Sequence, residues 1–178
     1  MSWLKNRLGL SLATLAIVAS GAFAYAQSTI DPTGRPENTH AGAAEHYAVW
    51  HDHDGWHIRT MTKEHEHHFK GKVECKGGEM EAVHGKGLEG KGAQADHWKV
   101  GPHLHELVFD FSTKGGEDGI DFKVDGKDAT LSFDLEIGEK EPKAELDRIF
   151  IGKAGAHPTE NPFTFPAHPA AGGKHNKK

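Results

Sequence analysis

Histidine is the residue type in this chain that points most directly to chemistry. The sequence contains 15 histidines among 178 residues, and most of them are close neighbours of one another. Imidazole is the commonest protein ligand for transition metals, and histidine is the only side chain whose unperturbed pKa lies between 5 and 8. The histidine content therefore indicates metal binding or proton chemistry.

Three His-x-His triplets stand out within this set. They are His51/His53, His65/His67 and His103/His105. Residues i and i+2 of a strand point to the same side and lie about 6.6 to 6.8 Å apart. Two imidazoles at this spacing can converge on one ion, about 2 Å from each ring nitrogen. A triplet on a strand can thus supply two ligands, and the third must come from another strand or loop.

Two of the triplets lead directly into segments with an apolar face. We expect the strands that follow His65/His67 and His103/His105 to lie side by side and to start in phase. The four imidazoles would then meet at one end of the domain and form a metal site. A single β-bulge would reverse the direction of one pair.

The remaining triplet lies in the run His51-Asp52-His53-Asp54, which we expect to form a hairpin turn and which is soon followed by His57. His51, His53 and His57 are therefore further candidate metal ligands. The same residue types also suit a solvated turn, so both interpretations stay open.

The donor types narrow the choice of metal. Imidazole with little sulfur suits zinc, copper(II) or nickel, and Met61 and Met80 could add soft ligands for copper. We expect zinc or copper and no other cofactor. Acidic residues next to the triplets, Glu64, Glu66 and Glu106, could orient the imidazoles.

The N-terminal residues have the layout of a secretory signal peptide. Lys5 and Arg7 precede the apolar stretch Leu8–Val18, and Ala24-Tyr25-Ala26 has the small-x-small pattern of a cleavage site. The apolar stretch is shorter than the roughly 20 residues that span a bilayer. We expect residues 1–26 to be removed and the mature chain to be periplasmic or secreted, without membrane insertion.

The rest of the chain is long enough for one domain with its own core. Residues 27–44 contain prolines, glycines and few apolar side chains, and we expect a flexible N-terminal segment there. We expect a β-sandwich domain over residues 45–165 and a disordered basic tail over residues 166–178.

Period-two alternation of apolar side chains dominates residues 45–165. The clearest strands are Ala129–Ile137 and His103–Phe111. Further expected strands are Tyr47–His51, Trp56–Thr62, His65–Cys75, Glu79–His84, Gly119–Val124 and Leu146–Ile151. Glycine-containing pairs such as Asp54-Gly55 and Gly115-Gly116 are expected turns between them. We therefore predict an all-β fold, a single antiparallel β-sandwich or jelly-roll-like domain of about eight strands.

Charge, cysteine content and the absence of catalytic motifs limit what this protein can be. The formal net charge is −5, and no basic stripe with interleaved aromatic residues is present, which argues against nucleic acid as a partner. The single cysteine, Cys75, cannot form an intramolecular disulfide. We assign no catalytic residues, because no nucleophile motif and no general base stand out.

We therefore expect an exported, histidine-rich β domain that binds a divalent transition metal, zinc or copper, for buffering or delivery. One alternative is a non-enzymatic binding module for carbohydrate or a cell-surface partner, in which Trp50, Trp56 and Trp98 stack on sugars rather than pack in the core. Further alternatives are a histidine-ligated zinc enzyme that activates water and a pH-responsive structural protein.

Overall fold

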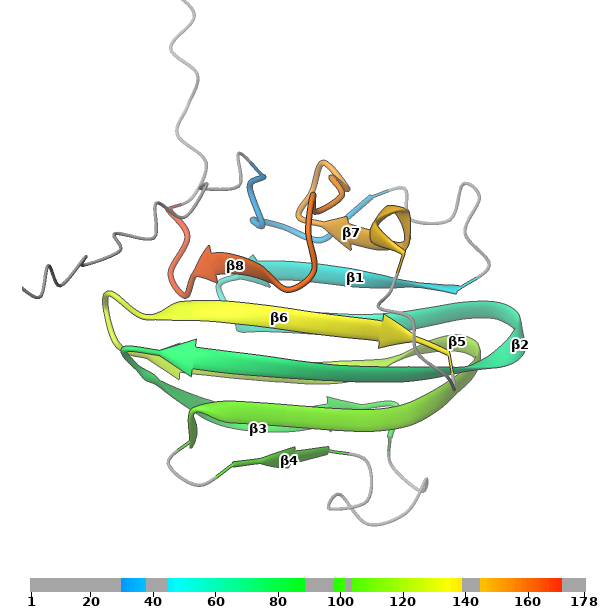
Figure 1. Ribbon diagram of the computed structural model, residues 1–178, viewed down its shortest axis with the longest axis horizontal. Helices are drawn as coiled ribbons and strands as arrows, with labels where there is room; N and C mark the ends of the chain where they lie inside the picture. Colours follow the sequence, from blue (N-terminus) through cyan, green and yellow to red (C-terminus); the bar gives the residue numbers. More distant parts are fainter. Residues whose placement is uncertain (1–29, 38–44, 89–97, 102–103, 139–144, 171–178) are drawn as a thin grey trace, which may run out of the picture.

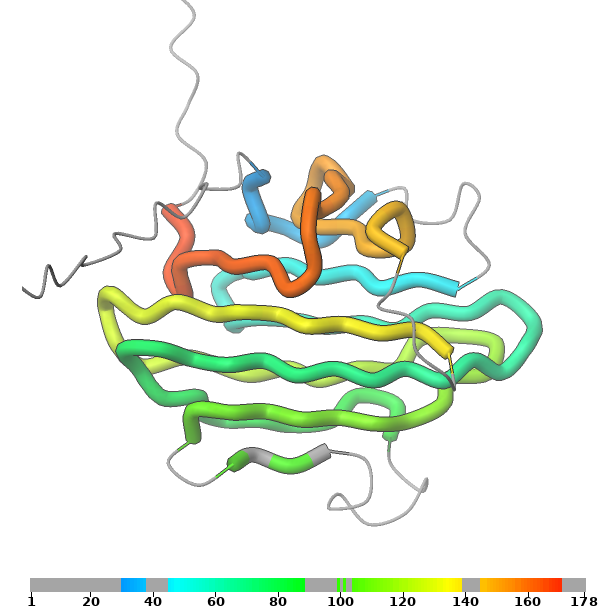
Figure 2. The backbone as a smooth tube through the Cα atoms, in the orientation of Figure 1, coloured from blue at the N-terminus to red at the C-terminus, as the bar shows by residue number. Residues whose placement is uncertain are grey.

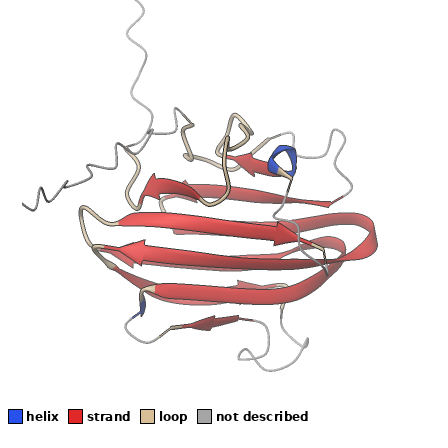
Figure 3. Ribbon diagram, viewed as in Figure 1, coloured by secondary structure: helices blue, strands red, loops and turns tan. Residues whose placement is uncertain are grey.

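The structure is a computed structural model that describes residues 30–37, 45–88, 98–101, 104–138 and 145–170. Most of these residues lie in strands, and η2 (Leu146–Arg148) is a short 3₁₀ turn (Figure 3). The strands are β1 (Glu45–Asp52), β2 (Gly55–Lys76), β3 (Glu79–Lys86), β4 (Trp98–Val100), β5 (Glu106–Asp125), β6 (Thr130–Ile137), β7 (Ile149–Ile151) and β8 (Phe163–Pro166). The all-β prediction is confirmed. The expected signal peptide, residues 1–26, lies outside the described residues.

Two long antiparallel strands organise the fold. β2 has 22 residues and β5 has 20, and they pair along nearly their whole length. The register shifts once, between Thr62 and Glu66 of β2. Both strands bend together at the right-hand end of the view, so each one contributes to two layers (Figures 1 and 2).

Each half of the long pair carries its own neighbours. The first layer has the order β7–β1–β2–β5–β3 and uses residues 55–62 of β2. The second layer has the order β8–β6–β2–β5–β4 and uses residues 66–76 of β2. Among the strands of the described residues, β1 and β7 pair in parallel and the other paired strands are antiparallel. The predicted sandwich is thus confirmed, built from a mixed rather than purely antiparallel sheet.

Two expected strand boundaries are wrong. Gly115 and Gly116, expected to form a turn, lie inside β5, and the expected strands Trp56–Thr62 and His65–Cys75 are one strand. Gly115 has a φ of 58° and Gly116 a φ of 157°. The left-handed conformation of Gly115, which a residue without Cβ adopts easily, lets the chain bend between layers without reversing direction.

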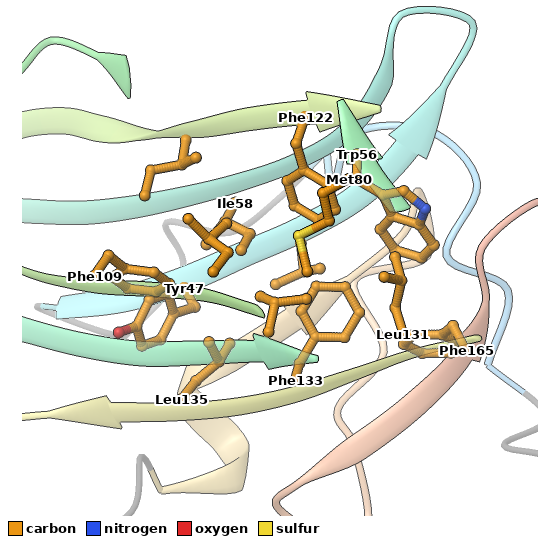
Figure 4. Packing of buried hydrophobic residues seen from close by; sticks show 14 of the residues in the cluster. Tyr47, Trp56, Ile58, Met80, Phe109, Phe122, Leu131, Phe133, Leu135 and Phe165 are labelled. Carbon is orange, nitrogen blue, oxygen red and sulfur yellow. The ribbon is translucent and has the colours of Figure 1, made fainter. Parts of the chain in front are cut away.

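The core lies between the two layers. Tyr47 of β1 makes edge contacts with Phe69 and Phe109 of the second layer, with ring centroids 5.2 and 6.4 Å apart. Its hydroxyl lies 2.8 Å from the carbonyl oxygens of Lys70 and Glu136. Figure 4 shows Tyr47 and Phe109 lying next to each other in the core. Burial of such aromatic surface is the main stabilising contribution to the fold.

Trp56 closes the core at its other end. Its ring lies 5.3 Å from Phe133 and 6.0 Å from Phe165, and its Nε1 donates a hydrogen bond to the carbonyl oxygen of Ala167 at 2.8 Å. Phe163 and Phe165 of β8 are both buried. The segment after β7 therefore packs on the edge of the sandwich, and its contacts extend past residue 165, to Ala167 in the tail that we expected to be disordered.

Residues 30–37 pack against β1, although they fall in the segment that we expected to be flexible. The amide of Gly34 donates to the carbonyl of His51, and the amide of His51 donates to the carbonyl of Pro32, both at 2.9 Å. Pro32 and Pro36 are buried. This segment is held by backbone hydrogen bonds, which composition alone does not reveal.

Candidate functional site

The β1–β2 hairpin presents three candidate metal ligands at its tip. Asp52 pairs with Gly55, so His53 and Asp54 form a two-residue turn. Gly55 has a φ of 127°, and a Cβ atom there would lie 2.5 Å from the carbonyl oxygen of Phe122. The expected hairpin turn is therefore confirmed, although its two residues are His53 and Asp54 and Gly55 is the first residue of β2, where a glycine is needed.

Ligand-type atoms converge at this turn. One atom from each of Asp52, His53 and Asp54 lies within 4.8 Å of the other two, and within the described ranges no other trio or larger set of histidine, cysteine or acidic side chains meets this distance. The Nε2 atom of His53 is 3.2 Å from Oδ2 of Asp54. Both side chains are exposed, whereas that of Asp52 is partly buried. We call these three residues the hairpin-tip cluster.

Asp52 is fixed in place by its neighbours. Trp50 Nε1 donates to its Oδ2 at 3.2 Å, and the Asp54 amide donates to its Oδ1 at 2.9 Å. His57 Nε2 also lies 2.9 Å from Oδ1. Burial by itself would raise the pKa of Asp52, but the hydrogen bonds from His57 and Asp54 lower this pKa overall. The carboxylate is therefore ionised near neutral pH and held in one orientation.

His57 lies between two carboxylates. Its Nδ1 is 2.6 Å from Asp121 Oδ1, opposite the contact with Asp52. Burial alone would lower the pKa of His57, but the hydrogen bonds to the two carboxylates raise it overall. Ionised carboxylates only accept hydrogen bonds, so both ring nitrogens carry protons in this arrangement. In this state His57 has no nitrogen lone pair for a metal and instead orients Asp52.

These residues belong to a cross-strand row on the outer face of the first layer. Trp50 is paired with His57, His57 with Asp121, and Asp121 with His84. Trp50 stacks on the His57 ring with centroids 4.7 Å apart. The row connects the hairpin to β3 through side chains of four strands.

Arg59 of β2 adds a second cation beside Asp121 of this row. Its guanidinium lies 2.6 Å from Asp121 Oδ1, and its Nε lies 3.2 Å from Glu117 Oε1. It crosses β5 at Gly119, where a Cβ atom would lie 2.1 Å from the Ile58 carbonyl oxygen and 2.8 Å from Arg59 Cδ. A glycine is therefore required for the arginine to reach both carboxylates.

Sequence reasoning missed Asp52, Asp54 and Asp121 as part of the site. The sequence contained one signal for the partners of Asp52 and Asp121. Apolar and polar side chains alternate along residues 56–62, which places His57 and Arg59 on the face opposite Trp56 and Ile58. Charged residues on one face predict exposure, and only the pairing with β5 brings a carboxylate to each of them.

His51 lies on the other face of β1 from the hairpin-tip cluster. Its ring is 5.3 Å from that of Trp56, at the rim of the core. Burial, more than any neighbouring charge, lowers the pKa of His51. Among the expected ligands of the third triplet, the structure thus places only His53 with the aspartates at the tip.

The expected meeting of the other two triplets is wrong for the histidines that the structure describes. His105 lies beside Cys75, because the Cys75 amide donates to the His105 carbonyl at 2.8 Å. His65 is ten residues earlier on β2, which corresponds to roughly 33 Å of strand. His65 and His67 lie at the bend within β2, whereas His105 directly precedes β5, and antiparallel pairing of β2 with β5 places these positions at opposite ends of the second layer. His103 lies outside the described residues.

His67 and His105 have other neighbours. His67 Nε2 is 3.4 Å from Oε2 of the buried Glu45, and His105 Nδ1 is 2.7 Å from the Gly78 carbonyl oxygen. His65 is exposed near the register shift of β2. The bulge that we noted as a risk does occur next to His65, although strand direction alone is enough to separate the pairs.

The tryptophans give little support to a sugar-binding surface. Trp50 and Trp56 are 4% and 1% exposed, so both pack inside the protein, and neither presents a free ring face. The side chain of Trp98 lies outside the described residues.

No family model matches the chain, and neither a curated protein nor a solved structure matches it. Over the described residues, no helix has the length and apolar character needed to cross a bilayer.

Proposed function

We propose that this protein binds a divalent transition-metal ion, zinc or copper(II), at the hairpin-tip cluster. The observation that supports the proposal is the convergence of ligand atoms from Asp52, His53 and Asp54 within 4.8 Å of one another. A carboxylate–imidazole donor set suits zinc and copper(II), whereas calcium and magnesium prefer oxygen donors alone.

The exposure of the cluster favours an exchangeable ion. Side-chain exposures of 87% for His53 and 68% for Asp54 leave coordination positions open to water. A structural zinc site uses four protein ligands in a closed tetrahedron. Three ligands on an open turn suit a protein that takes up and releases metal, as buffering or delivery requires.

The surroundings of Asp52 hold its side chain in one orientation. Its carboxylate is already oriented by Trp50, Asp54 and His57. Residues that orient a ligand in this way typically change metal affinity by about 10- to 100-fold when they are mutated. We further propose that the protein acts outside the cytoplasm, because residues 1–26 resemble a secretory signal peptide.

Substitution of His53 tests the site. We expect His53→Ala to abolish the tightest zinc or copper(II) binding event in calorimetric titration, because it removes the one nitrogen donor of the cluster. The wild-type melting temperature should rise with metal, since an ion at 100 times its Kd stabilises the folded state by about 2.7 kcal/mol. The variant should lose that rise.

His65→Ala is the matched control, because His65 is also an exposed histidine but lies at the bend of β2, away from the tip. It should bind zinc as the wild type does. Asp54→Asn should weaken binding as His53→Ala does. Equal binding by the wild type and His53→Ala, or loss of binding in His65→Ala alone, would refute the hairpin site.

A further inference from the structure

A serine, a histidine and an aspartate meet on the outer face of the second layer. His68 of β2 is directly paired with Ser112 of β5, and Asp110 precedes Ser112 by two residues, so all three side chains lie on one face. His68 Nε2 is 2.5 Å from Asp110 Oδ1, and His68 Nδ1 is 3.3 Å from Ser112 Oγ. The imidazole therefore lies between a carboxylate and a hydroxyl group.

The carboxylate fixes the tautomer of the imidazole. An ionised carboxylate only accepts hydrogen bonds, so Nε2 of His68 carries the proton that Asp110 accepts. In the neutral ring, Nδ1 then has the lone pair and can accept the hydroxyl proton of Ser112. A base that is oriented by a third group and lies next to a hydroxyl is the arrangement that activates serine as a nucleophile. Compared with the serine proteases, the two ring nitrogens have exchanged roles.

Strand pairing holds the base and the hydroxyl in register. β2 is paired on its other edge with β6, and β5 is paired on its other edge with β4. Sites built on such strands are positioned more precisely than sites on loops. The side chain of His68 is 25% exposed and that of Asp110 is 55% exposed. Water around the carboxylate weakens its electrostatic effect, so we expect slow turnover.

A shallow recess beside Asp110 has room for a small substrate. Its volume is about 180 Å³, and its lining includes Val108, Asp110, Lys70 and Lys72. A cavity of roughly 150 Å³ holds one benzene ring, so the recess suits a short acyl group or a single ring.

A cation lies near the place where negative charge would develop. Lys70 is the diagonal neighbour of Ser112 across β2 and β5, and its Nζ is 3.9 Å from Asp110 Oδ2. Diagonal neighbours in a sheet are about 7–8 Å apart, which a long side chain can bridge. An ammonium group at this position can stabilise the oxyanion that forms when a serine attacks a carbonyl carbon.

We propose that Ser112, His68 and Asp110 form an esterase site for small acyl esters. Ser112 Oγ attacks the carbonyl carbon while its proton passes to His68 Nδ1. The bond between the carbonyl carbon and the alcohol oxygen breaks, and His68 gives the proton to that oxygen. Water then attacks the acyl-serine and gives one proton to His68, the carboxylic acid leaves, and the proton returns to Ser112 Oγ. Asp110 acts as a positioning residue, because it touches only the imidazole.

This esterase site does not depend on the proposed function. It lies on the second layer, whereas the hairpin-tip cluster lies on the turn between β1 and β2. No residue belongs to both sites, so each proposal can fail alone. His53→Ala, which tests the metal site, should leave ester hydrolysis unchanged.

Covalent labelling tests the nucleophile. We expect a fluorophosphonate probe to attach to Ser112, as located by peptide mass spectrometry, and to leave Ser132 unmodified. Ser132 of β6 is the matched control, because it is a half-buried strand serine paired with Glu74 of β2. Ser112→Ala should lose both the label and the burst of p-nitrophenol from p-nitrophenyl acetate, whereas Ser132→Ala should keep both. Free imidazole also cleaves this ester slowly, so the Ser112→Ala rate is the baseline.

Substitution of the other two residues tests their roles. His68→Gln should slow labelling of Ser112 by about 100-fold or more, since a general base contributes about 10²- to 10⁴-fold. Asp110→Asn should also slow it, because the asparagine amide can donate to Nε2 and leave the proton on Nδ1, while the melting temperature stays close to that of the wild type. A folded wild type that leaves Ser112 unlabelled, or equal labelling rates in the wild type and His68→Gln, would overturn the proposal.

Discussion

His57 illustrates how single residues set the pH response of this protein. The carboxylates of Asp52 and Asp121 raise its pKa in the folded state. The stabilising contribution of charged His57 is fully present below the unfolded value of about 6.5 and is lost as the pH rises through the higher folded value. The pKa values of the two aspartates are lowered, so their contributions are lost only in acid, as the pH falls through their folded values.

We therefore predict that His57→Gln changes the pH dependence of stability. Between pH 5 and 8, the free energy of unfolding of the wild type should fall more steeply with rising pH than that of the variant. Glutamine keeps a polar side chain but cannot carry the charge. Urea unfolding across this pH range measures both slopes.

His51 provides the control for that comparison. Its pKa is lowered by burial, so its contribution has the opposite sign and decreases as the pH falls. The contribution of His51 is the same in the wild type and in His57→Gln, so it cancels when the two stability profiles are subtracted. Parallel stability profiles for the wild type and His57→Gln would show that the two carboxylates do not hold a charged imidazole.

At the scale of elements, the bend shared by β2 and β5 decides the architecture. Gly115 has a φ of 58°, and a Cβ atom there would only reach ordinary contact, 3.6 Å, with the Lys63 carbonyl oxygen. Space is therefore available, and the backbone conformation alone restricts this position. Left-handed geometry costs roughly 1–2 kcal/mol for a residue with a Cβ.

We predict that Gly115→Ala lowers the free energy of unfolding by about 1 kcal/mol. Gly115→Asn should cost less, because asparagine tolerates the left-handed conformation better than alanine. Denaturant unfolding of the two variants separates conformation from size, since asparagine is the larger residue. A greater loss for asparagine than for alanine would show that crowding dominates.

At the scale of the whole molecule, contacts between the layers hold the bent sheet closed. Tyr47 spans them, since its hydroxyl reaches the carbonyl oxygens of Lys70 on β2 and Glu136 on β6. Burial of the ring raises the pKa of Tyr47 well above its usual value, so the hydroxyl stays protonated as a donor. This one side chain ties β1 to two strands of the opposite layer.

We predict that Tyr47→Phe destabilises the protein by about 1–2 kcal/mol, because it keeps the aromatic packing and removes the donor from two carbonyls. Urea unfolding monitored by tryptophan fluorescence measures the change. The slope of the transition should match that of the wild type if the two layers still unfold together. A stability equal to that of the wild type would show that the hydroxyl contributes packing only.

The sequence by itself determined which side chains face inward. Alternation along residues 129–137 predicted a strand in which Ala129, Leu131, Phe133 and Leu135 are buried and Ile137 is partly buried, because side chains of a strand alternate between its faces. Residues 47–51 also lie in a strand as predicted, but both faces of β1 are covered there, since Tyr47 to Trp50 are all buried. The turn-forming pair Asp54-Gly55 likewise predicted the hairpin turn, which His53 and Asp54 form directly before Gly55 of β2. These features depend on neighbours in the chain, and the sequence contains them directly.

Only the tertiary structure decided which residues come together. His65 lies in the middle of β2 and His105 directly before β5, so antiparallel pairing separates them, while Asp52 meets Asp121 through His57 across three strands. His46 and Met61, 15 residues apart, come into contact because the hairpin pairs them. Strand direction and register are set by the burial of the whole core, so no short sequence motif encodes the position of a ligand on another strand.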